Sequence, residues 1–457
     1  MVITMERRGG SEIILLTSIV TPGNRQEIER NRKGNLALAN TTFQLGLVQG
    51  ILSNPDLTKS MSVLNMPGVG AYPFLYRSPF YKGFGTSISK DGLDVLVNDL
   101  GFCNIVYLKR HFKYRTLCKA IRKVFHRKTE MVAEDSSCNS REDLSNEPIV
   151  ITYGIDESCL RALYRLRSEG YGFTSVLIVP DLEGMTEKVN HPLYRIADRK
   201  NTHTPFKAVD GFVFISPFMV ERLQTEGKPW IVVEGLYAAE NSLLPYSLKC
   251  KCEDIPSSIS LDAEKSNFYP QLSVNFIMYS GELSERNGVL RLLKAFSMIE
   301  DKNLKLVFSG GGECEQDVKQ AALADRRIVY TGQIAHEDVL SLQRRAMMLV
   351  NPRLPLETFT RYSFPSKTLE YLASGVPVIM YNLDTLPDEY RSVCLFPKDF
   401  SIEALRDSIC SVAAMSSGQR NEIGGRGQKM ILQHKNAAIQ SRKILDFALK
   451  LSKEKSD

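Results

Sequence analysis

The stretch YSFPSKTLEYLASGVPVI, residues 362–379, has the pattern of a short helix followed by a buried strand. Pro365 stands in the expected first turn, where helices accept proline, and Gly375 stands where the helix should end. Between them, apolar residues recur at helical spacing, and the segment 376–379 continues as an apolar strand. Strands that are apolar on both faces are typical of parallel sheets covered by helices on both sides.

The same alternation of short apolar runs and amphipathic stretches extends along both halves of the chain. The runs expected to form strands are 12–18, 62–65, 103–108, 148–154, 174–180, 211–216, 230–235, 274–281, 304–312, 327–332, 347–352, 376–381 and 393–397. The segment 156–172 has leucines at helical spacing and ends in glycine, which predicts a strand–helix–strand unit. We therefore predict an α/β fold of two doubly wound Rossmann-like domains facing across a cleft, with the ligand at the carboxyl ends of the strands.

Changes in composition suggest the domain boundaries. Residues 248–272 are polar with few core candidates, and we interpret them as a linker or a solvated insertion. They separate an N-terminal domain, 1–247, from a C-terminal domain, 273–435. The last segment, 436–457, is expected to form a helix that packs back on the N-terminal domain.

The overall composition is that of an ordinary globular protein: 457 residues, 43% hydrophobic, 24% charged, with a net charge of +6. The mild positive charge favours contact with anions without naming them. The nine cysteines are scattered and odd in number, which favours reduced thiols and a cytoplasmic compartment. No cysteine or histidine set has zinc spacing, so no metal is predicted. We expect neither a secretory leader nor a transmembrane helix, which would need about 18 apolar residues in a row.

Glu370 suggests what the ligand is. A helix N-terminus offers backbone N–H groups and a partial positive charge, which suit a phosphate. Ser366 and Lys367 would add a hydroxyl and an ammonium. Glu370 follows Ser366 by one helical turn on the same face, about 6 Å along the axis, so it would reach a diol attached to that phosphate, as in the ribose of a nucleoside diphosphate. The alternative is a surface glutamate paired with Lys367 or Arg361, and spacing alone leaves both open.

The segment NPRLPLETFTRYSFPSKTLEYLASGVPVI, residues 351–379, resembles the donor-binding segment of family 4 retaining glycosyltransferases, which have the two-domain GT-B architecture. It is most similar to the bacterial polysaccharide-synthesis branch, and the resemblance extends through 279–296, 304–313 and 329–352. The first half resembles the family only in strand–helix order and length. The resemblance implies a nucleotide-sugar donor held by the C-terminal domain, a saccharide or lipid-linked acceptor held by the N-terminal domain, retention of anomeric configuration, and no separate cofactor.

Two departures from the family pattern remove charge expected beside the donor. Glu370 matches the second glutamate of the family's E-x7-E motif, whose usual partner is the donor ribose, but the first glutamate falls on Tyr362. In GELSERNG, residues 281–288, the family's arginine and lysine that face the pyrophosphate fall on Glu282 and Asn287. A leaving nucleoside diphosphate develops charge that preorganised cations normally stabilise, so other cations are expected to take over.

Three residues are predicted to be catalytic. Arg353 and Lys367 lie in matching motifs and would stabilise the leaving group, and Asp181, at the end of a strand, would orient an acceptor hydroxyl. A solvated loop arginine and a turn aspartate are the plain alternatives for Arg353 and Asp181. The predicted donor-binding residues are Gly281, Arg286, Gly310, Gly311, Tyr362, Ser366, Lys367 and Glu370.

The segment 107–128 is strongly cationic, with nine lysines or arginines, two histidines and no acid. Apolar residues interleave at roughly helical spacing, and a cationic amphipathic helix suits an anionic membrane surface. The alternative is a packed helix with a solvated basic face. Nucleic acid is not expected as a partner because no recognition fold is visible. We therefore expect a cytoplasmic protein that can associate peripherally with the inner membrane face.

Together these features predict a retaining glycosyltransferase of glycan or polysaccharide synthesis. Two alternatives stay open: a non-catalytic GT-B subunit that binds nucleotide-sugar and supports a partner enzyme, and a nucleotide-sugar epimerase. A dinucleotide-dependent dehydrogenase is disfavoured because no G-x-G-x-x-G follows the first expected strand.

Overall fold

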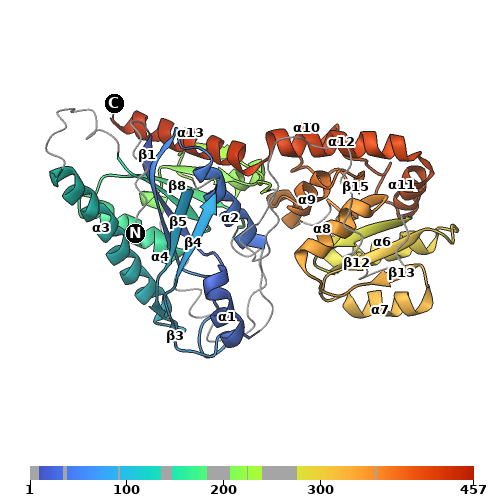
Figure 1. The fold of residues 1–457 in the computed structure, drawn as a ribbon, viewed down its shortest axis with the longest axis horizontal. Coiled ribbons are helices and arrows are strands. Elements are labelled where there is room, and N and C mark those ends of the chain that lie inside the picture. Colours follow the sequence, from blue (N-terminus) through green and yellow to red (C-terminus); the bar gives the residue numbers. More distant parts are fainter. Residues whose placement is uncertain are drawn as a thin grey trace. The chain divides into compact units, whose positions relative to one another are not determined.

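The computed structural model of the chain describes residues 10–33, 39–90, 93–134, 147–182, 206–223, 225–238, 275–355 and 358–456. The chain divides into two compact units, and Figure 1 shows their elements in chain order. Unit 1 comprises Met1–Tyr246 together with Asn436–Asp457, and unit 2 comprises Ser247–Lys435. The expected linker or insertion, 248–272, lies outside the described residues.

Unit 1 is built on an eight-stranded sheet in the order β10-β9-β8-β7-β1-β2-β5-β4. Neighbouring strands are parallel, except that β4 is antiparallel to β5. The strand order reverses beside β1, so the switch point of the sheet lies between β1 and β7. The strands are β1 (Ser11–Thr17), β2 (Thr58–Asn65), β4 (Gly85–Lys90), β5 (Leu93–Asp99), β7 (Ile149–Tyr153), β8 (Thr174–Val179), β9 (Gly211–Phe214) and β10 (Trp230–Val232), and a separate ribbon pairs β3 (Phe80–Tyr81) with β6 (Phe102–Cys103).

Helices cover both faces of this sheet. Successive side chains of a strand point to opposite faces, so Ile13 and Leu15 enter one core while Ile14 and Leu16 enter the other. The first core is closed by α2 (Ala39–Leu52) and α13 (Ala437–Ser456), and the second by α1 (Pro22–Asn31), α3 (Lys109–Glu134) and α4 (Glu157–Ser168). The chain therefore completes unit 1 with a helix that follows unit 2 in sequence.

Unit 2 is built on a five-stranded parallel sheet in the order β13-β12-β11-β14-β15, with its switch point between β11 and β14. The strands are β11 (Phe276–Ser280), β12 (Lys305–Ser309), β13 (Ile328–Tyr330), β14 (Met348–Asn351) and β15 (Val378–Met380). One face packs against α6 (Val289–Ser297), α7 (Glu315–Ala324) and α11 (Ile402–Ala414). The other helices are α8 (His336–Arg345), α9 (Lys367–Ala373), α10 (Asp388–Arg391) and α12 (Ser417–His434), of which α8 contacts β11 and α9 contacts β14, β15 and α12.

The helix and strand expected in 362–379 are α9 and β15. The helix begins at Lys367, two residues after the expected start at Pro365, with Ser366 as its N-cap. Tyr371 and Leu372 are buried, and the strand that follows is buried along its whole length. The pattern in this stretch therefore predicts the local structure correctly.

Two of the expected strands are wrong. The run 103–108 contributes only Cys103 to β6 and then leads into α3, because the chain turns after Ile105, whose carbonyl accepts hydrogen bonds from the amides of Leu108 and Lys109. The run 393–397 forms a single bridge between Leu395 and Ile379. The antiparallel pair β4 and β5 was not expected at all. Within the described ranges, no helix is both long and apolar enough to cross a bilayer.

Candidate functional site

The loops that follow β11 and β12 meet at the carboxyl edge of the sheet of unit 2. Gly281 and Gly310 have φ of 130° and 132°, a region that favours glycine. A Cβ on Gly310 would lie 1.9 Å from the carbonyl oxygen of Gly281, and a Cβ on Gly281 would lie 1.8 Å from Nζ of Lys367. The two glycines therefore let two backbone loops and one ammonium group come together where a ligand is expected in this kind of sheet.

Lys367 extends from the first position of α9 to the end of β11. Its Nζ donates to the hydroxyl of Tyr279 over 3.3 Å and lies 4.9 Å from the centre of the Tyr279 ring. Burial lowers the pKa of Lys367 to about 8, with Glu282 and Glu370 acting in the opposite direction. An anion bound next to this ammonium would stabilise its charged form.

Arg353 follows β14 on the other side of the switch point and is only 8% exposed. Its guanidinium donates to Oγ of Ser363. Burial, followed by repulsion from Arg286, lowers the pKa of Arg353 to about 10. Lys367, Arg353 and Arg286 therefore lie close enough to repel one another, which gathers positive charge at the carboxyl edge of β11 and β14.

Glu282 and Asn287, two of the three residues that depart from the pattern of the resembling family, contact each other. Glu282 accepts a hydrogen bond from Nδ2 of Asn287 over 3.0 Å, and its Oε2 lies 2.9 Å from Nη2 of Arg286. The side chains of Arg286 and Glu282 are 42% and 47% exposed, and an exposed ion pair of this kind contributes little to stability. Arg286 can therefore exchange Glu282 for a phosphate oxygen at small cost.

Glu370 faces α8. Its Oε1 accepts a hydrogen bond from Nε2 of Gln343, and its Oε2 lies 3.6 Å from Nε2 of His336. The side chain is 27% exposed, so the carboxylate is accessible from one side only. Gln343 was missed from the sequence, although a polar residue at i+4 from Val339, within the apolar stripe of a helix, is a recognisable signal.

The remaining predicted donor-binding residues are Tyr362, Ser366 and Gly311. Tyr362 is buried, whereas Ser366 is exposed at the helix start. The amides of Thr368 and Leu369 donate to the carbonyls of Pro365 and Ser366, over 2.8 and 3.2 Å. The first turn of α9 thus uses part of its own N–H groups, and the side-chain cations dominate the electrostatics of the site. Gly311 lies next to Gln333, at the end of β12.

In unit 1, Asp181 follows β8 at the carboxyl edge of the sheet and is exposed. Partial burial nevertheless raises the pKa of this carboxyl. Tyr153 ends the neighbouring strand β7, and burial together with the charge of Asp181 raises the pKa of its hydroxyl. Among the described residues, no three His, Cys, Asp or Glu side chains gather as metal ligands.

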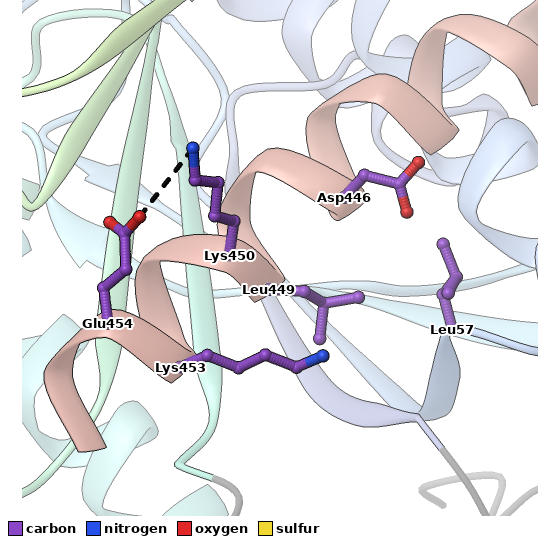
Figure 2. A pocket seen from close by; sticks show the side chains of 6 residues that line it. All are labelled: Leu57, Asp446, Leu449, Lys450, Lys453 and Glu454. Carbon is purple, nitrogen blue, oxygen red and sulfur yellow. Dashed lines mark ion pairs between the residues drawn. The ribbon is translucent and has the colours of Figure 1, made fainter. Parts of the chain in front are cut away.

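A hollow of about 370 Å³ on unit 1 lies between α13 and the start of β2, and Figure 2 shows its lining. The lining residues are Leu57, Asp446, Leu449, Lys450, Lys453 and Glu454. Leu57 precedes β2, so the hollow lies at the amino edge of the sheet, opposite the edge where doubly wound sheets bind ligands. Its charges also partly neutralise each other, since Lys450 and Glu454 form an ion pair of 3.8 Å. We therefore assign the candidate site to the carboxyl edge of unit 2.

The cationic segment 107–128 lies mostly in α3, and the larger part of its apolar stripe is buried. Leu117, Ile121 and Phe125 are buried in the core between the sheet and α4. Basic residues on the same side pair with acids at α4: Lys113 with Asp156, Arg110 with Glu157 and Arg122 with Glu169. The stripe from Leu117 to Phe125 therefore belongs to the core, and contact with an anionic surface stays a prediction for the outer face of α3.

Comparisons with known proteins bear on both units. Residues 275–414 match the family model described as Glycosyl transferases group 1. No curated protein matches the chain. Among solved structures, sucrose-phosphate synthase from Thermosynechococcus elongatus is similar at 15% identity and a TM-score of 0.57, over 97% of this chain and 100% of that chain. A glycosyltransferase from Rickettsia africae is similar at 13% identity and a TM-score of 0.55, over 97% and 99%.

A structure described as trehalose-6-phosphate from E. coli, bound with UDP-2-fluoro glucose, is similar at 11% identity and a TM-score of 0.54, over 96% of this chain and 99% of that chain. At such identities the likeness is one of fold. It confirms the expected fold class, an α/β chain with two doubly wound Rossmann-like units of the GT-B type. The family match over unit 2 supports glycosyl transfer as the general reaction.

Proposed function

We propose that the chain is a retaining glycosyltransferase whose unit 2 binds a nucleotide-sugar donor. The observation that carries this proposal is the position of Lys367, whose ammonium lies against Gly281 at the end of the central strand with a pKa lowered to about 8. Enclosing a cation in this way is unfavourable unless an anion binds there. Arg353, buried nearby, adds a second cation to the same place.

The donor's diphosphate would lie against Gly281 and Gly310, between Lys367 and Arg353. Its ribose would then lie at Glu370, one helical turn from the diphosphate. The match of 275–414 to the glycosyltransferase model supports this placement, as does the UDP-sugar in the similar E. coli structure. Tyr362 would line the site as a buried wall rather than as a polar contact.

The chemistry would depend on charge stabilisation. As the bond between the sugar and the diphosphate breaks, negative charge grows on the leaving phosphate, and the two preorganised cations stabilise it. For a retaining reaction by front-face attack, the departing phosphate takes the proton of the acceptor hydroxyl, so no separate base is needed. Asp181 would orient that hydroxyl from unit 1, and the acceptor would be a saccharide or a lipid-linked saccharide of glycan or polysaccharide synthesis.

A lipid-linked acceptor would require contact with a membrane surface, and the outer face of α3 suits an anionic one. His111, Arg115, Lys119 and Lys123 recur every four residues and are exposed. Three apolar side chains at the N-terminal end of α3 are also exposed: Tyr107, Leu108 and Phe112 are 53%, 46% and 40% exposed. Cations beside interfacial aromatics are typical of peripheral binding at the inner membrane face.

The direct experiment is a binding screen by thermal shift and calorimetry with UDP-, GDP-, ADP- and CMP-sugars, followed by a transfer assay with the donor that binds. Glu370→Ala should weaken binding of that donor about tenfold or more, because a charge-assisted hydrogen bond is lost, while the unfolding temperature stays close to that of wild type. Unchanged affinity would contradict the placement of the ribose.

A second candidate is a non-catalytic subunit that binds nucleotide-sugar and supports a partner enzyme. It is favoured by Tyr362, buried at the position of the family's first glutamate, and by the carboxylate of Glu282 beside the expected diphosphate. Binding of a donor without hydrolysis or transfer, for every donor in the screen, would select this candidate. Turnover by wild type that is lost in Lys367→Met would exclude it.

A further inference from the structure

We propose that the donor ribose is held by a divided grip, with one hydroxyl on Oε2 of Glu370 and the neighbouring hydroxyl on Nε2 of His336, and with Gln343 as the positioning residue that fixes Glu370. This inference rests on the proposed function, since it concerns the nucleotide bound by unit 2. It adds two residues of α8 to a site otherwise built from α9 and the loops after β11, β12 and β14.

The two oxygens of Glu370 have different surroundings. Oε1 faces inward and accepts the hydrogen bond from the Gln343 amide. Oε2 faces His336, whose side chain is 43% exposed, so this oxygen lies on the accessible side. Oε1 is covered by the Gln343 amide, whereas Oε2 lies on the accessible side, so Oε2 is the oxygen offered to a ligand. Together with the neighbouring imidazole nitrogen, it presents two different polar atoms to the two hydroxyls of a diol.

Gln343 is fully buried, and its amide can point only one way. Its Nε2 donates to Glu370 and, over 3.0 Å, to Oγ of Ser280. Reversing the amide would place its carbonyl oxygen against a carboxylate. In the orientation that remains, Oε1 is buried and has no hydrogen-bond partner among the described residues. A buried unpaired carbonyl is destabilising, so stability alone does not explain a glutamine here, whereas fixing Glu370 does.

The same hydrogen-bond network reaches the loop after β11, where the diphosphate is proposed to bind. The amide of Ser280 donates to the hydroxyl of Tyr371 over 2.8 Å, and that hydroxyl donates to the carbonyl of Ser280 over 3.1 Å. Ser280 ends β11 and directly precedes Gly281. Gln343 and Tyr371 therefore connect Glu370 to Gly281 through hydrogen bonds at Ser280. This network fixes the distance between the carboxylate proposed to bind the ribose and the loop proposed to bind the diphosphate.

His336 supplies the second half of the grip. It is the first residue of α8, and its Nε2 lies 3.6 Å from Oε2 of Glu370, slightly beyond hydrogen-bond distance. Two polar atoms at this separation can each bind one of two adjacent hydroxyls. The ring nitrogen can donate or accept according to its tautomer, so it can pair with a hydroxyl in either sense.

The test uses calorimetry on the full chain with UDP, GDP and ADP, and then with the 2′-deoxy and 3′-deoxy forms of the one that binds. We expect His336→Phe to weaken the ribonucleotide about tenfold, and to leave unchanged the affinity for the deoxynucleotide that lacks the hydroxyl held by His336. Gln343→Met should weaken the ribonucleotide in the wild-type background and have no further effect in a Glu370→Gln background. Glu337→Gln, an exposed neighbour in the first turn of α8, is the matched control and should change nothing.

Each outcome distinguishes the two proposals. If wild type binds none of the diphosphates, the proposed function and the divided grip both fall. If wild type binds but His336→Phe weakens the ribonucleotide and both deoxynucleotides alike, or weakens none, only the divided grip is overturned. Additive effects of Gln343→Met and Glu370→Gln would show that Gln343 does not act through Glu370, and thermal unfolding of each variant verifies that the fold is intact.

Discussion

Nζ of Lys367 lies where a side chain on Gly281 would begin: a Cβ at position 281 would come within 1.8 Å of that nitrogen. We therefore expect Gly281→Ala to displace the ammonium and to weaken nucleotide binding about tenfold. The far end of a lysine can move, so the fold should persist with a loss of about 1–2 kcal/mol from the unfavourable φ. Calorimetry and urea unfolding measure the two effects.

The matched control is Gly332→Ala, whose φ of 72° is also positive but whose Cβ would meet no atom within 4 Å. It should cost similar stability and leave nucleotide affinity near that of wild type. Equal losses of affinity in the two variants would mean that the effect of Gly281→Ala does not come from displacement of the Lys367 ammonium.

Nucleotide binding should take up a proton at mildly alkaline pH. The pKa of Lys367 is lowered by burial to about 8 in the free site, and a bound diphosphate would raise it. Below the free-site pKa the ammonium is already charged and no uptake occurs, whereas above it the free amine is neutral and the complex is protonated. Affinity should therefore fall as the pH rises above about 8.

The measurement for this proton uptake is calorimetry in two buffers of different ionisation enthalpy, at a pH above the free-site pKa. The apparent binding enthalpy should differ between the buffers for wild type and agree between them for Lys367→Met. Identical enthalpies for wild type in both buffers would rule out the linkage.

Removing the carboxylate of Glu282 should strengthen nucleotide binding. Glu282 holds Arg286 and lies near Lys367, so Glu282→Gln frees one cation and removes a charge that repels phosphate. The gain should be about three- to tenfold at low salt and smaller at high salt, because exposed charges are screened. Titrations at two salt concentrations test this, with Glu285→Gln on the same loop as control. A weaker affinity for Glu282→Gln would argue that Glu282 contacts the donor itself.

The pair of Lys113 and Asp156 should be a strong contributor to the stability of unit 1. Burial opposes ionisation of Asp156, but the ammonium of Lys113 outweighs it and lowers the pKa of Asp156 to about 2. Asp156→Asn leaves a buried lysine uncompensated and should lower the free energy of unfolding by about 2–3 kcal/mol. Since the pKa of Asp156 is lowered on folding, this contribution is present above about pH 4 and is lost as the pH falls towards 2.

Urea denaturation of Asp156→Asn at neutral and acid pH measures the effect. Glu157→Gln, which removes the partner of Arg110, is the control: the Arg110 side chain is 40% exposed against 9% for Lys113, so the loss should be at most about 1 kcal/mol. Equal losses of unfolding free energy in the two variants would contradict the expectation that the buried Lys113 depends more on its acid than the exposed Arg110 does.

Sedimentation with lipid vesicles tests the outer face of α3. Replacing Arg115, Lys119 and Lys123 by glutamine should reduce binding to vesicles of anionic lipid by about 100-fold, since each cation contributes about 1 kcal/mol near such a surface. Neutral phosphatidylcholine vesicles should bind wild type weakly, and Lys294→Gln on α6 serves as a control substitution. Retained binding in the triple variant would exclude this face as the membrane contact.

Sequence periodicity predicted the parallel strands because each is apolar on both faces, and β7, β8 and β11 lie within one or two residues of their expected positions. It did not predict β4 and β5, because β4 is mostly polar and exposed with only Ile88 buried, and β5 is buried on one face only. A turn signal was present, since the pair Asp91–Gly92 is typical of a hairpin. The run 103–108 has the apolar content of a strand, but its residues after Ile105 form the turn that leads into α3.

The residues of the candidate site likewise fall into two groups: those that a local motif predicts and those that only the fold brings together. Lys367 and Glu370 could be identified because a contiguous motif contains them. Gln343 and His336 could not, because their relation to Glu370 arises from the packing of α8 beside α9, which no local pattern specifies. The apolar stripe of α3 is visible in the sequence, but its burial follows from the packing of α4, whose capping residues Asp156 and Glu169 pair with Lys113 and Arg122.

The position of α13 has a consequence for biosynthesis. Ile444, Leu445 and Ala448 are fully buried against the first unit, yet they are translated after the whole of the second. On the ribosome, a nascent chain can complete unit 2 while unit 1 still exposes the surface that α13 will cover. Unit 2, whose synthesis begins second, is therefore the first that can finish folding, because unit 1 is complete only when α13 has been translated.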